Sequence, residues 1–68
     1  MGLTTLQKQL IALLKHYITE ERNITPIMLM LKDEKQQWEM VDYIAQNKET
    51  ATNDSVMKKA IEIAEQAN

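Results

Sequence analysis

Apolar residues recur every three or four positions through the first third of the chain. The stripe consists of Leu3, Leu6, Leu10, Leu13 and Tyr17. This spacing places their side chains on one face of an α-helix. Thr4 followed by Gln7 matches a capping box, which satisfies free backbone N–H groups at the start of a helix. Because Asn23 is a suitable C-terminal cap, the pattern predicts a helix over about residues 3–22.

An uninterrupted apolar run marks the next segment. Ile27–Leu31 contains only apolar residues and follows Thr25-Pro26, a pair typical of a helix start, where threonine caps free N–H groups and proline fits the first position. Five consecutive apolar residues on a helix point to every side of it. Since a bundle of this size cannot enclose a helix all round, we expect part of this run to meet solvent or another chain.

Two arrangements are compatible with residues 26–46. One continuous helix would place Glu34 in the middle of its apolar stripe. A break avoids this, and Asp33 with the glutamine three residues later forms a second capping box. The chain would then contain a short helix at about 26–32 and a longer one at about 34–46. We favour the break and keep the continuous helix as the alternative.

The remaining helices have narrower apolar faces. The face predicted for the 34–46 helix consists of Trp38, Val41, Ile44 and Ala45. After a polar loop, Thr52 or Asn53 is expected to cap a last helix over about 54–67. Its apolar side is formed by Val56, Met57, Ala60, Ile61, Ile63, Ala64 and Ala67.

Composition supports an all-α fold and limits how it can be stabilised. One glycine and one proline in 68 residues favour helix over sheet. We predict a small bundle of three main helices, with a short fourth helix at about 26–32 if the break is present, in a single domain of residues 1–68. The core of so short a chain supplies only ~3–5 kcal/mol of net stability. Without cysteine there are no disulfides, so self-association is the remaining supplement and a homodimer is expected.

Charge and hydropathy argue against several classes of partner. A net charge of −2 attracts neither nucleic acid nor anionic lipid. The longest apolar runs are five residues, against the ~20 that a membrane span requires. We expect no signal peptide in the first twenty residues, and we expect the cytoplasm as the location.

Nucleic-acid binding is the alternative function. A small helical nucleic-acid-binding or transcriptional regulator would use the adjacent Lys58-Lys59, or the 34–46 helix as a reading helix. That helix also carries Glu34, Glu39 and Asp42, which would face phosphates badly. We therefore expect nucleic acid not to be the partner.

Candidate catalytic chemistry is sparse. His16 and Glu20 lie four residues apart, and Glu39 and Asp42 lie three apart. The first pair lacks a third metal ligand at usable spacing, and the second, a possible acid–base pair, falls on the side of its helix away from Trp38 and Val41. There is also no nucleophile beside a base and no phosphate-binding glycine loop. We interpret these residues as solvated surface groups, and predict that the protein is not an enzyme and uses no metal, cofactor or small-molecule ligand.

A protein–protein contact is the function that the pattern favours. Methionines serve adaptable binding surfaces as well as cores, and a contiguous exposed apolar patch usually marks an interface. We predict a non-catalytic adaptor, inhibitor or regulator that self-associates through the apolar run, with tryptophan as an anchor. The predicted contact residues are Ile27, Met28, Met30, Leu31 and Trp38.

Overall fold

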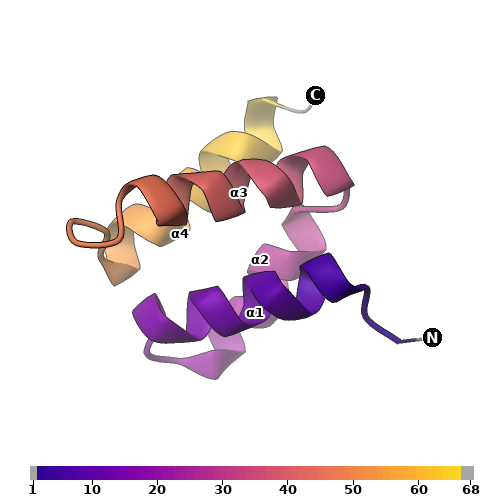
Figure 1. Ribbon diagram of the computed structural model, residues 1–68, viewed down its shortest axis with the longest axis horizontal. Helices are drawn as coiled ribbons and strands as arrows, with labels where there is room; N and C mark the ends of the chain where they lie inside the picture. Colours follow the sequence, from indigo (N-terminus) through magenta and orange to yellow (C-terminus); the bar gives the residue numbers. More distant parts are fainter. Residues whose placement is uncertain (1, 67–68) are drawn as a thin grey trace.

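Four α-helices follow one another along the chain in the computed structural model, which describes residues 2–66 (Figure 1). They are α1 (Thr5–Tyr17), α2 (Ile24–Met30), α3 (Glu34–Gln46) and α4 (Asn53–Gln66), with a 3-10 turn, η1 (Glu21–Asn23), before α2. No strand occurs within the described residues. The predicted all-α bundle of three main helices and one short helix is therefore confirmed.

The starts of α1 and α3 follow the predicted capping signals. At α1, Gln7 N–H donates to Thr4 Oγ1 over 3.1 Å and Thr4 N–H donates to Gln7 Oε1 over 2.8 Å. At α3, Asp33 N–H donates to the Gln36 side chain over 3.0 Å as part of a capping box. The break at Asp33 is thus confirmed, and the continuous helix over 26–46 is wrong.

Helix α4 is capped in the same way, by Thr52. Ser55 N–H donates to Thr52 Oγ1 over 3.1 Å, and Thr52 N–H donates back to the serine hydroxyl over 2.8 Å. Of the two predicted caps, Thr52 is therefore the one that the chain uses. The predicted apolar contribution of Ala67 lies outside the described residues.

The predicted end of the first helix is wrong. Helix α1 ends at Tyr17, and Ile18 adopts an extended conformation with φ −93° and ψ 113°. Ile18 and Thr19 are both β-branched, which weakens helix propensity at this point. The extended backbone turns the Ile18 side chain into the core, where it is buried. The residues that follow form η1, so Asn23 does not cap α1.

The start of α2 also differs from the prediction. The helix begins at Ile24, directly after η1, and its N-cap Asn23 makes no side-chain capping bond. Thr25 therefore lies inside the helix and does not cap it. Pro26 occupies the third helical position, where the backbone has no intrahelical acceptor for an N–H group and a missing donor costs nothing.

All four helices contribute to one core. Figure 1 shows α1 and α3 side by side, with α2 and α4 behind them. The buried cluster consists of Leu10, Leu14, Ile18, Ile24, Ile27, Leu31, Met40, Ile44, Val56, Ala60 and Ile63. The short α2 packs against α1, α4 and the preceding η1.

The predicted apolar face of α3 is rotated from the observed one. Gln36, Gln37, Met40 and Ile44 point inward, whereas Trp38 is 48% exposed. The Gln37 Nε2 donates to the Leu31 carbonyl oxygen over 2.8 Å, and this bond satisfies a polar group that would otherwise be buried without a partner. Gln37 shares a face with Met40 and Ile44, and Trp38, one residue on, points away from the core.

Candidate protein-interaction surface

Helix geometry divides the apolar run of α2 between the core and the surface. Ile27 and Leu31 lie four residues apart and are buried, with exposed fractions of 2% and 0%. Leu29 lies about 200° around the helix from Ile27 and is 68% exposed. Met28 and Met30 flank it and are partly buried against the core. The chain's own fold therefore uses Ile27 and Leu31, and Leu29, which the prediction omitted, is the most accessible residue of the run.

A groove of about 480 Å³ runs between α1 and α2. Four of its lining residues are apolar and at least partly exposed, and we call them the α2 face: Leu3, Ile11, Met28 and Leu29. Lys15 and Glu21 also line the groove, and the lysine Nζ lies 3.9 Å from the glutamate Oε1. The groove thus combines an apolar lining with one charge of each sign.

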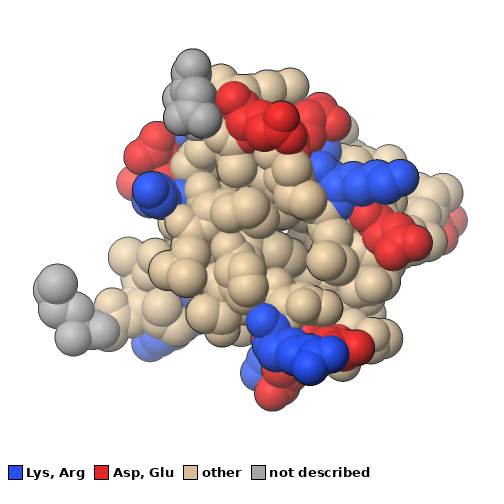
Figure 2. Space-filling view, turned by 180° about the vertical axis from the view of Figure 1, so that it is seen from behind, with Lys and Arg blue, Asp and Glu red and all other residues tan. Residues whose placement is uncertain are grey.

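Charged side chains lie around α2 but not on it. Helix α2 contains no acidic or basic residue. Figure 2 views the molecule from the side on which α2 and α4 lie, and its centre is uncharged, with acidic and basic side chains around the periphery. Interface cores are depleted in charged residues, so the absence of charge on α2 is compatible with a protein–protein interface.

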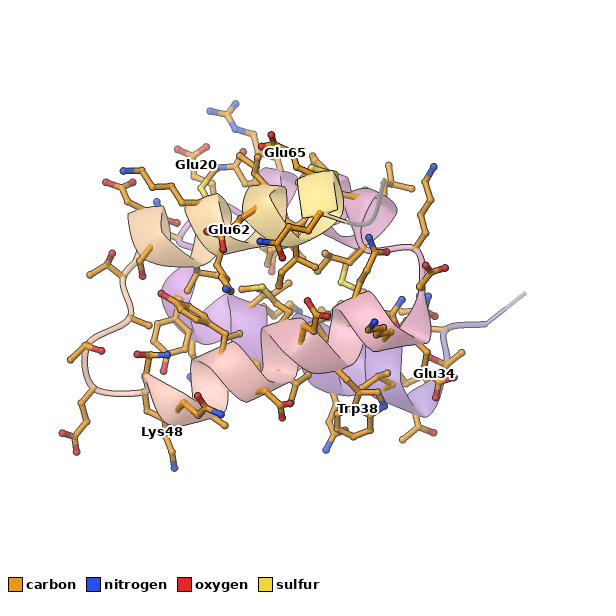
Figure 3. The ribbon with its side chains drawn as sticks, turned by 90° about the horizontal axis from the view of Figure 1, so that it is seen from above. Glu20, Glu34, Trp38, Lys48, Glu62 and Glu65 are labelled. Carbon is orange, nitrogen blue, oxygen red and sulfur yellow. The ribbon has the colours of Figure 1, made fainter. Side chains whose placement is uncertain are left out.

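Trp38 lies in a different groove. This second groove has a volume of about 470 Å³ and lies between the start of α1 and α3. It is lined by Leu6 and Trp38 together with Thr4, Thr5, Gln7, Gln9, Lys32, Glu34 and Gln37. Figure 3 shows the tryptophan ring directed away from α4, on the same side as Glu34. The structure thus brings Met28 and Leu29 to one groove and leaves Trp38 in the other.

The residues that the sequence offered for catalysis or metal binding lie on the surface. His16, Glu39 and Asp42 are exposed, as interpreted from the sequence. Glu20 lies beyond the end of α1, where it pairs with Arg22, so it does not share a helix face with His16. Among residues 2–66, no group of three or more histidine, cysteine, aspartate or glutamate side chains is arranged to hold a metal ion.

The two adjacent lysines of α4 have different surroundings. Lys59 Nζ lies 3.3 Å from Glu62 Oε1 and 5.6 Å from the centre of the Tyr43 ring. Lys58 is exposed, near Glu62 and Glu65, and Figure 3 places both glutamates on α4. The Lys58-Lys59 pair is therefore accompanied by acidic groups, which does not favour contact with phosphate.

Comparisons of the chain with protein-family models, with curated proteins and with solved structures gave no significant match. In the part of the chain that the structure describes, none of the helices combines the length and the apolar character that crossing a membrane requires.

Proposed function

We propose that this chain is a non-catalytic protein-interaction module that binds its partner through the α2 face. The observation that carries the proposal is Leu29, a large apolar side chain that is 68% exposed at the edge of an apolar groove. Burying a leucine side chain is worth about 1.5–3 kcal/mol, so a partner that covered this position would gain binding energy from it. An adaptor, inhibitor or regulator needs no more than such a surface.

The uncharged surroundings support the same conclusion. An interface core is depleted in charged residues, while its rim is polar and accessible. The α2 region agrees with this plan in one respect, because α2 has no charged residue and the charges of its groove, Lys15 and Glu21, come from α1 and η1. A cytoplasmic location stays a prediction of the sequence.

The proposal is tested by comparing three immobilised forms of the protein in an extract of its native host. The forms are the wild type, Leu29→Glu on the α2 face and Trp38→Glu in the second groove. Both substitutions replace an accessible apolar side chain with glutamate, so they are matched in chemistry. We expect Leu29→Glu to lose proteins that the wild type and Trp38→Glu retain. Equal retention by all three forms would contradict the proposal.

A further inference from the structure

We propose that the occupant of the α2 face is a second copy of this chain, paired by a two-fold axis so that Leu29 of each copy enters the groove of the other. This inference rests on the proposed function and names its partner. In a two-fold interface the same patch serves both subunits, so every contact occurs twice. A surface can pair in this way only if it carries both a projecting group and a recess.

The α2 face carries both. Leu29 projects, with 68% of its surface exposed, and the recess is the groove of about 480 Å³ beside it. The groove is lined by Leu3, Ile11 and Met28, which offer an apolar side chain an apolar environment. A pair of copies would therefore bury two leucines, one in each groove.

The accessible area is compatible with a dimer of modest size. The chain exposes 4908 Å² in all. A specific interface at the lower end of the observed range buries about 600 Å² per partner, or about one-eighth of this surface. Leu3 and Leu29, two of the large apolar side chains that the monomer leaves exposed, lie on the α2 face and would be covered in such a pair.

Charge also permits two copies to meet at this face. Like charges brought together across an interface cost several kcal/mol, and a face with charges of one sign only would repel its own copy. The groove instead carries one lysine and one glutamate, Lys15 and Glu21, which already lie 3.9 Å apart. With no charge on α2 itself, self-pairing brings no excess of either sign into the interface.

Sedimentation velocity over a wide concentration range tests the inference. We expect a reversible monomer–dimer equilibrium for the wild type. Leu29→Glu should raise the dimer dissociation constant at least about tenfold, equivalent to about 1.4 kcal/mol. Trp38→Glu should leave it unchanged, and circular dichroism verifies that both variants keep the helical content of the wild type.

Cysteine crosslinking tests the contact itself. The chain has no cysteine, so Leu29→Cys and Ile11→Cys can be made in separate copies and mixed under mild oxidation. A disulfide between the two variants is expected, and a mixture of Trp38→Cys with Ile11→Cys should give far less. Equal crosslinking in both mixtures, or a dimer that Leu29→Glu does not weaken, would place the interface elsewhere and overturn the inference.

The two proposals fail differently. A wild type that stays monomeric at every concentration overturns the second-copy inference. The proposed function fails only if Leu29→Glu also retains the same host proteins as the wild type. If the wild type is monomeric and binds another protein of the host, and Leu29→Glu loses that protein, the partner is a different chain.

Discussion

Helix α2 exposes an apolar side chain, whereas the first turn of α3 buries polar side chains. Helix α2 consists almost entirely of apolar residues, yet Leu29 is largely exposed. The first turn of α3 is polar, yet it buries Gln36 and Gln37 while the following Trp38 is half exposed. The comparison shows that position relative to the neighbouring helices decides burial here. Neighbouring segments leave the Leu29 side of α2 exposed, and α3 begins beside a carbonyl group that requires a donor.

The largest effect is expected from removing the most buried apolar residue at the end of α2. Leu31→Ala should lower the free energy of unfolding by about 2–5 kcal/mol, because it removes buried methyl groups and leaves a cavity. That loss is comparable with the whole stability of a domain of this size, ~3–5 kcal/mol, so the variant should be largely unfolded at room temperature.

The matched control is Leu29→Ala, two residues earlier in the same apolar run. Because Leu29 is exposed, its replacement should change the free energy of unfolding by less than about 0.5 kcal/mol in the monomer. Urea denaturation followed by circular dichroism, at a concentration where the protein is monomeric, measures both variants. Equal losses for the two leucines would contradict the division of α2 between core and surface.

A smaller effect is expected from the buried amide of α3. Gln37→Leu keeps a side chain of similar size but removes the donor to the Leu31 carbonyl oxygen. A buried carbonyl left without a partner costs about 1–3 kcal/mol. Gln46→Leu, at an exposed position of the same helix, is the control and should be close to neutral. If Gln37→Leu instead proved more stable than the wild type in urea, the hydrogen bond would not be the reason for the burial.

The smallest of these effects compares the two helix starts. Asp33→Ala removes the capping box of α3 and should cost about 1 kcal/mol. Asn23→Ala at the start of α2 removes no side-chain capping bond, so its cost should be only a few tenths of a kcal/mol. Thermal unfolding by calorimetry distinguishes them, and a larger loss for Asn23→Ala would reverse the comparison.

Local signals in the sequence predicted the starts of α1 and α3 well, whereas the Thr25-Pro26 signal misplaced the start of α2. The side chains of Thr4 and Gln7, like those of Asp33 and Gln36, act within one turn of the backbone that they cap. Such contacts need no knowledge of the rest of the chain. The same holds for the break before α3, because its cap and its polar first turn are adjacent in the sequence.

Features that depend on distant residues were not predicted. Asn23 was a plausible end for the first helix. In the structure α1 already ends at Tyr17, and the extended Ile18 that follows is buried in the core. The face of α3 could not be assigned, because the need for Gln37 arises from the position of the Leu31 carbonyl in the folded chain. A large apolar residue such as tryptophan is expected in the core. No signal in the neighbouring sequence indicated that Trp38 points outward.

The candidate surface was predicted in part. The apolar run itself indicates that some of its residues stay accessible, and Leu29 does so. Identifying Leu29 requires the orientation of α2, which Ile27 and Leu31 set by packing inward. The contribution of α1 to the groove, through Leu3 and Ile11, depends on a helix pairing that the spacing of apolar residues does not specify.

The absence of charge on α2 has a consequence for colloidal behaviour. Repulsion between molecules in solution comes only from the other parts of the chain, and it weakens as the pH approaches the isoelectric point of about 5.2. At that pH nothing on the α2 side opposes close approach, so dense or mildly acidic solutions bring these surfaces together first. We therefore expect the solubility of the protein to be lowest near that pH, with α2 among the surfaces that come into contact.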